Sequence, residues 1–111
     1  MQQGDSLFKE RKYEEACKEF VAAAQLNVSS ALAANNVGFT YFKMGQFENA
    51  ILWFDKSVAL DPKRAVAYGN LGDAYFNLDR KADAKKAYQK YLELAPNSKS
   101  APIIMERMAN L

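Results

Sequence analysis

The sequence predicts an all-α protein, a right-handed α-solenoid made of three helix-turn-helix repeats and a C-terminal capping helix. Three observations lead to this prediction. The chain matches itself when it is shifted by 34 residues, which is the separation of Gly38 and Gly72. Small and apolar residues recur at helical spacing, as in Ala50, Phe54 and Val58. Proline follows two of the second helices, where its missing N–H group ends a helix.

The self-match keeps three classes of residue in register. Glycines recur in the first helices, alanines in the second helices, and an aromatic residue follows each alanine by four positions: Gly4, Gly38, Gly72, Ala16, Ala50, Ala84, Phe20, Phe54 and Tyr88. A glycine inside a helix costs about 1 kcal/mol relative to alanine, so its recurrence implies that the paired helices approach closely there, with alanine as the small partner. The aromatic residue is expected to fill the space against the following repeat, because one helix pair cannot cover its own apolar face.

The first copy covers residues 1–30 and is truncated. We expect a short helix over residues 1–10 that lacks its first turn, a turn at residues 11–12 and a second helix over residues 13–26. Serines in the connector at residues 27–30 can cap the next helix. The missing first turn suggests that the chain is a fragment of a longer array.

The middle copy covers residues 31–64 and the third copy residues 65–98. In the middle copy, a turn at residues 43–46 contains Gly45, which can adopt the left-handed conformation that ends a helix, and Pro62 closes the unit. The third copy should contain helices near residues 64–78 and 81–94, with Asp79 and Arg80 in the turn between them.

Residues 99–111 form the capping segment of this single domain. Pro102 is acceptable in the first turn of a helix, and Ile103, Ile104 and Met108 lie on one apolar stripe. The pattern predicts a helix over residues 101–110 that covers the third repeat. Alternatively, this helix is the first of a lost fourth repeat, in which case its outer face would be unusually apolar.

The repeated residues resemble those of the tetratricopeptide repeat. The resemblance rests on the glycine and Tyr41 or Tyr75 in the first helix, on the alanine and the following aromatic in the second helix, and on the terminal proline. Some positions depart from the family pattern. Ala34 stands where the family has a large aromatic, and Val28 stands where a proline is expected. The resemblance implies a non-catalytic scaffold that binds a peptide or helix of a partner protein in a concave groove.

Composition and charge exclude several functional classes. The net charge is +2 with both signs interleaved, which gives no electrostatic case for nucleic acid or an anionic membrane. No apolar run is long enough to span a bilayer, and the N-terminus does not resemble a signal peptide. The location of the protein stays open, with the cytoplasm as the default. The single cysteine, Cys17, is expected to be a half-buried apolar residue.

Catalysis and cofactor binding are not expected. The chain contains no histidine, its carboxylates are not paired in an apolar setting, and no residues have metal-ligand spacing. The segment from Gly69 to Gly72 looks loosely like a glycine-rich phosphate loop. It aligns, however, with residues 35–38 inside a predicted helix, so it is interpreted as repeat architecture. We therefore predict no catalytic residue, no cofactor and no metal.

Candidate binding residues lie on the first helices, which line the concave side of stacked pairs. They are Asp5, Phe8, Asn36, Phe39, Phe42, Lys43, Asn70, Asp73, Phe76 and Asn77. Phe39 is the best anchor candidate, because its equivalents are Asp5 and Asp73 and the repeat does not demand an aromatic there. Phe8, Phe42 and Phe76 recur with the period and serve either packing or contact with a partner. Asn36 and Asn70 either bind the main chain of an extended peptide or belong to a solvated face.

Three further expectations concern the partner. Some members of the family hold a C-terminal carboxylate with a clamp of lysine, arginine and asparagine side chains. Here Asn36 fits one place, but Val66 and Asn70 stand where cations are needed, so the clamp is not expected. Trp53, on the second helix, is expected to pack partly, with an exposed second contact surface as the alternative. The alternative function is self-assembly, as a homo-oligomer or an end-to-end stack through the terminal helices.

Overall fold

The computed structural model describes residues 12, 15, 18 and 30–111. All regular elements over residues 30–111 are helices, namely α2 (Ala31–Lys43), α3 (Phe47–Leu60), α4 (Ala65–Asn77), α5 (Lys81–Leu94) and α6 (Ala101–Ala109). The prediction of an all-α helical repeat is therefore confirmed, and the expected helices of the middle and third copies and of the capping segment agree with the structure to within a residue or two. The division into repeats at residues 1–30, 31–64, 65–98 and 99–111 stays a prediction. Of residues 1–26 only Lys12, Glu15 and Lys18 are described, and all three are helical, so Lys12 does not lie in the turn that was expected at residues 11–12. The rest of the first copy, with Cys17 and the first glycine and alanine, lies outside the described residues.

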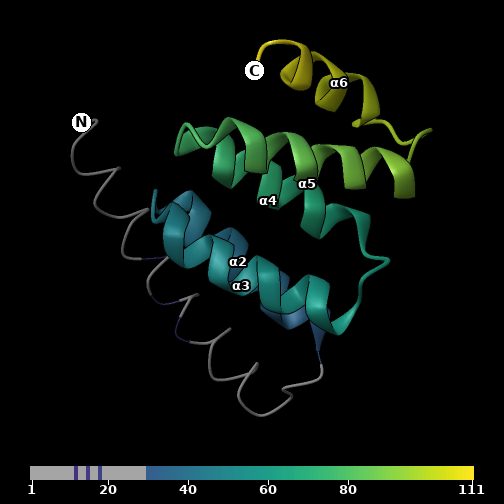
Figure 1. The fold of residues 1–111 in the computed structure, drawn as a ribbon. Helices are drawn as coiled ribbons and strands as arrows, with labels where there is room; N and C mark the ends of the chain where they lie inside the picture. Colours follow the sequence, from purple (N-terminus) through teal and green to yellow (C-terminus); the bar gives the residue numbers. More distant parts are fainter. Residues whose placement is uncertain (1–11, 13–14, 16–17, 19–29) are drawn as a thin grey trace.

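Each helix packs against its neighbour in the chain. Helix α2 pairs with α3 and α4 pairs with α5, while α3 contacts α4 and α5 contacts α6. In Figure 1, α2 and α4 lie behind α3 and α5, and α6 lies beyond the second pair. The first helices of the two pairs therefore share one side of the molecule, and their contact with each other extends this side across both pairs.

The two helix turns have the same backbone conformation. Gly45 has a φ of 77° and Asp79, at the equivalent position, has a φ of 58°. In both turns the next residue bonds back to the first helix, from Gln46 N to Tyr41 O and from Arg80 N to Tyr75 O, each at 2.9 Å. Glycine adopts a left-handed conformation without a steric penalty, and aspartate tolerates it better than most residues. The predicted turns are thus confirmed, including the one without glycine.

The repeated glycines make room for an aromatic ring. A Cβ atom added to Gly72 would lie 2.3 Å from Tyr88 Cε1, and one added to Gly38 would lie 2.6 Å from Phe54 Cδ1. The close approach of paired helices is therefore confirmed, but the nearest partner is the ring rather than the small alanine that the sequence suggested. The alanine contributes its main chain, since Ala50 O would lie 3.1 Å from a Cβ atom at Gly38.

The core forms where consecutive pairs meet. Phe54 packs with Leu71 and Ala74 of the next pair, which confirms that this aromatic fills the space toward the following repeat. Tyr88 packs with Ile104 of α6 in a second cluster. Two serines add polar contacts: the fully buried Ser57 donates to Ala31 O at 2.7 Å, and Ser30 Oγ caps α2 by accepting from Ala33 N at 3.0 Å.

Trp53 is half-buried, as expected. It packs with Met44 against Val37, and Lys56 Nζ lies 4.9 Å from the centre of its ring. Among the described residues, no helix is long and apolar enough to cross a membrane.

Candidate functional site

The side shared by α2 and α4 continues onto α6 and carries the predicted binding residues. We call this surface the inner face. Its exposed and half-buried side chains are Leu32, Asn36, Phe39, Lys43, Val66, Asn70, Asp73, Phe76, Asn77, Ile103 and Arg107. Of the predicted residues, Asp5 and Phe8 lie outside the described part of the chain. The others lie on α2 and α4, two neighbouring helices, although Phe42 turns out to be largely a packing residue.

Phe39 is exposed but held in place. Its side chain is 43% exposed, its ring stacks on that of Phe42 with a centroid distance of 6.5 Å, and Lys43 Nζ lies 5.1 Å from its centre. Phe42 in turn meets the ring of Phe47 edge-on at 5.3 Å and packs against the core. An aromatic ring that is already fixed loses little entropy when a partner covers it.

The repeated phenylalanines of the first helices have two different roles. Phe42 is half-buried and supports Phe39, so packing explains this phenylalanine. Phe76, one period further on, is 44% exposed and free to contact a partner. The sequence could not distinguish these roles, because both residues occupy the same position of the repeat.

The two repeated asparagines also differ. Asn70 Nδ2 donates to Asn35 Oδ1 at 3.0 Å, which joins α4 to α2, and Asn35 itself is buried. The side chain of Asn36 makes no hydrogen bond within the described part of the chain, and its carbonyl oxygen accepts from Thr40 Oγ1 at 2.9 Å. Asn70 is thus partly structural, whereas Asn36 keeps its amide for solvent or a partner.

Asp73 is the centre of a polar cluster that joins three helices. Its Oδ1 accepts a hydrogen bond from Tyr88 Oη on α5 at 2.6 Å and another from Arg107 Nη1 on α6. Burial of the Tyr88 hydroxyl and its bond to Asp73 raise the pKa of Tyr88 above its usual value. At the C-terminal end of α4, Asn77 Nδ2 donates to Asp73 O at 2.8 Å. Asp73 therefore joins α4 to α5 and α6, and it lies on the inner face.

Arg107 was not among the residues predicted from the sequence. A signal was present, because Arg107 follows Asp73 by 34 residues and so occupies the same position of the repeat. Opposite charges at equivalent positions of α4 and α6 would have indicated this ion pair. It was missed because the repeat pattern is weaker in the capping segment.

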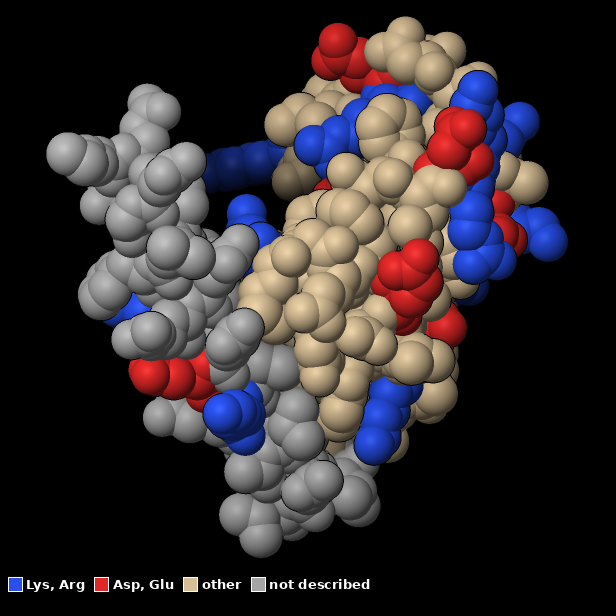
Figure 2. Space-filling model, turned by 90° about the vertical axis from the view of Figure 1, so that its left-hand side faces the viewer, with Lys and Arg blue, Asp and Glu red and all other residues tan. Residues whose placement is uncertain are grey.

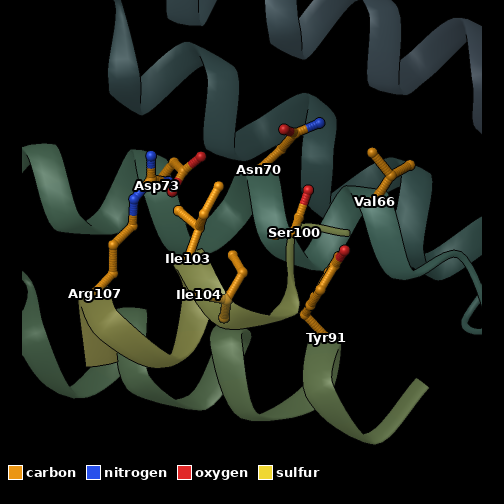
Figure 3. A pocket seen from close by; sticks show the side chains of 9 residues that line it. Val66, Asn70, Asp73, Tyr91, Ser100, Ile103, Ile104 and Arg107 are labelled. Carbon is orange, nitrogen blue, oxygen red and sulfur yellow. Dashed lines mark hydrogen bonds and ion pairs between the residues drawn. The ribbon is translucent and has the colours of Figure 1, made fainter. Parts of the chain in front are cut away.

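A pocket of about 250 Å³ lies between α4, α5 and α6 at one end of the inner face. Its lining consists of Val66, Gly69, Asn70, Asp73, Tyr91, Ser100, Ile103, Ile104 and Arg107. Figure 3 shows Ile103 and Arg107 reaching from α6 toward Asn70 and Asp73 of α4. Apolar side chains and the polar groups of Asn70, Asp73, Ser100 and Arg107 thus line the pocket together.

Charge on the inner face is nearly balanced. It carries Lys43 and Arg107 as cations and Asp73 as an anion.

The ends of the helix pairs, where the turns lie, also carry charges of both signs. Figure 2 views this side of the molecule and shows Lys and Arg interspersed with Asp and Glu rather than gathered into one patch. The described residues contain no group of three or more His, Cys, Asp or Glu side chains that could hold a metal ion.

Comparison with known proteins identifies the helical repeat of this chain. A family model described as tetratricopeptide repeat matches residues 29–97. No curated protein matches the chain in sequence. Many solved structures match it in fold.

Three of these structures illustrate the similarity. The first TPR of Spaghetti (RPAP3), bound to the HSP90 peptide SRMEEVD, has a TM-score of 0.84 and 28% identity, with 98% of this chain and 86% of that chain covered. The second TPR domain of human RPAP3, in complex with the HSP70 peptide SGPTIEEVD, has a TM-score of 0.82 and 26% identity, with coverages of 97% and 90%. The type III secretion translocator chaperone SycD of Yersinia enterocolitica has a TM-score of 0.85 at 18% identity, with coverages of 98% and 78%, and shows the fold alone.

Proposed function

Because the chain belongs to the tetratricopeptide repeat family, we propose that it is a non-catalytic protein-interaction module that holds a peptide segment or helix of a partner protein on its inner face. The observation that carries this proposal is the state of Phe39. Its ring is 43% exposed and is fixed by Phe42 and Lys43, while the equivalent position of the next repeat is Asp73. Helix packing therefore does not require an aromatic residue there, and a binding role explains it.

Two similar domains support the proposal, since their structures contain the HSP90 peptide SRMEEVD and the HSP70 peptide SGPTIEEVD. Both peptides are acidic. The inner face of this chain offers Lys43 and Arg107 as cations, and Asp73 already pairs with Arg107. We therefore expect a less acidic ligand here, bound through apolar contacts with Phe39 and Phe76 and through the side-chain amide of Asn36.

The test uses a displayed library of random peptides selected on the full chain, with the affinity of the recovered peptides measured by fluorescence anisotropy. Phe39→Ala should weaken binding by at least about tenfold, as expected for the loss of an anchor residue. Leu52→Ala is the matched control, because Leu52 is a large apolar residue on α3 and is 67% exposed. Circular dichroism should show equal helicity for all three chains. Peptides that bind the Phe39→Ala variant as tightly as the original chain would contradict the proposal.

Self-assembly is the second candidate. Ile103 and Met105 of α6 are each 52% exposed, which gives the capping helix the unusually apolar surface expected of a buried contact. Sedimentation equilibrium over a range of concentrations should then give a mass that rises with concentration and that falls in an Ile103→Ser, Met105→Ser variant. A constant monomer mass would exclude this candidate.

A further inference from the structure

Gly69 has no explanation in the repeat. Its equivalents are Asn35 in α2 and Ile103 in α6, so the architecture does not demand glycine at this position. Gly72, by contrast, is a repeat position, and the ring of Tyr88 lies directly over it. At Gly69 an added Cβ atom would lie 3.1 Å from Tyr91 Cδ2. Gly69 therefore lets the Tyr91 ring pack directly against α4, where it forms one wall of the pocket.

Apolar side chains line the pocket from both α4 and α6. Val66 of α4 is 49% exposed and Ile103 of α6 is 52% exposed, although both line the pocket. Ile104 and Tyr91 are buried and form its inner part. At about 250 Å³ the pocket is smaller than the roughly 300–1,000 Å³ typical of small-molecule and cofactor sites. Its size suits a single side chain.

Two polar side chains of the pocket lining, Asn70 and Arg107, suit the uncharged main chain of a bound peptide. Arg107 gives one N–H group to Asp73 and has further donors, while its charge is balanced by that carboxylate. Asn70 gives one N–H group to Asn35, which leaves its oxygen to accept. One group that donates and one that accepts match the carbonyl and N–H groups of an extended peptide. The balanced charge gives no advantage to an acidic side chain.

We infer that the pocket between α4 and α6 is a specificity subsite that takes one large uncharged apolar side chain, of the leucine, isoleucine, methionine or phenylalanine class, from an extended partner segment. Gly69 allows Tyr91 to form the inner wall, Val66 and Ile103 provide the apolar contact, and Asn70 and Arg107 bind the main chain beside it. This inference rests on the proposed function, and it adds to Phe39 a second point of contact at the other end of the inner face.

The experiment uses the peptides selected from the random library. Sequences recovered on the original chain should share a large apolar residue at one position, and its replacement by alanine should weaken binding by about ten- to a hundredfold. On the Ile103→Ser chain the same replacement should weaken binding only a few-fold, because the contact has already been lost. Met105→Ser is the matched control, since Met105 lies on the same helix, is also 52% exposed and does not line the pocket.

The outcomes separate this inference from the proposed function. Peptides whose binding depends on Phe39 but is unchanged by Ile103→Ser and by Val66→Ser would overturn the subsite and leave the proposed function standing. Selection of an acidic residue at the shared position would overturn the subsite as well. If no selected peptide depends on Phe39 or on Ile103, both the proposed function and the subsite are wrong. Both serine variants alter exposed side chains, so circular dichroism should confirm that they fold.

Discussion

The hydroxyl group of Tyr88 donates a hydrogen bond to Asp73 Oδ1 at 2.6 Å, while the ring of the same residue covers Gly72. One side chain thus fills the space between paired helices and fixes a carboxylate on the inner face. In the middle repeat the two equivalent residues are Phe54 and Phe39, so there the same space is filled without a polar contact. The inner faces of the two repeats differ as a result: one presents an aromatic ring and the other a fixed carboxylate.

The first prediction concerns alkaline pH. Because burial and Asp73 raise the pKa of Tyr88, its hydroxyl stays protonated in the folded chain after an unfolded tyrosine has ionised. Its contribution to stability is therefore present below about pH 10, the unfolded pKa, and is lost as the pH rises above that value, by at most about 1.4 kcal/mol per pH unit.

This loss can be measured by urea unfolding at several pH values in Tyr88→Phe and in the original chain. The variant should lose less stability above about pH 10, because it lacks the group that titrates. Phenylalanine keeps the ring over Gly72, as Phe54 does over Gly38. If the free energy of unfolding fell equally steeply with pH in the two chains, Tyr88 would not be the cause of the loss of stability above about pH 10.

The second prediction concerns Gly72. In an open helix, replacement of glycine by alanine stabilises by about 1 kcal/mol. At this position the added Cβ atom would lie 2.3 Å from the Tyr88 ring, so we expect Gly72→Ala to lower the free energy of unfolding by about 1–3 kcal/mol instead. Thermal and urea unfolding measure the change. In a Tyr88→Leu background the same substitution should cost less, and purely additive effects would contradict the steric explanation.

The third prediction separates the two repeated asparagines. Asn70→Ala removes the donor to the buried Asn35, which should lower the free energy of unfolding by about 1 kcal/mol. Asn36→Ala removes an amide that makes no bond within the described part of the chain, so its effect should stay within about 0.5 kcal/mol. Urea unfolding of both variants is the measurement. Equal destabilisation would mean that the Asn35–Asn70 bond does not contribute.

The fourth prediction concerns the attachment of α6. Arg107 bonds to Asp73 with both side chains partly exposed, so Arg107→Gln should lower global stability by less than about 1 kcal/mol. The local effect should be larger, because few other residues of α6 are buried: Ala101 and Ile104. Hydrogen exchange should therefore accelerate in residues 101–109 and stay unchanged in α2, which serves as the internal control. Uniform acceleration, or none, would show that this ion pair does not hold the helix.

Much of the fold could be predicted from the sequence because it depends on local spacing. The period of glycine, alanine and aromatic residues placed α2 to α5 and both turns within a residue or two. Gly45 adopts the predicted left-handed conformation, and Asp79 adopts it as well, in the turn where it was expected. Apolar periodicity also placed α6. These features follow from helix geometry and from where a chain can end a helix, and both are local properties.

The candidate site was predicted only in part. Phe39 was identified because the repeat gives no reason for an aromatic residue there, and the structure places it on the inner face with its ring exposed. Phe42 and Phe76 could not be distinguished, since Phe47 covers one of them from the next helix. Arg107 and the pocket beside it were missed, because both depend on how α6 packs beside α4.

The sequence by itself therefore determined the helices, their turns and the repeat, since each is decided within a few residues or by comparison of one copy with the next. Only the tertiary structure decided which side chains remain available for a partner. Asn70 and Asp73 are engaged by Asn35, Tyr88 and Arg107 from three other helices, whereas the Asn36 amide makes no hydrogen bond to any residue from 30 to 111. The physical reason is that availability depends on contacts between helices distant in the chain, and the spacing of residues along one helix carries no information about them.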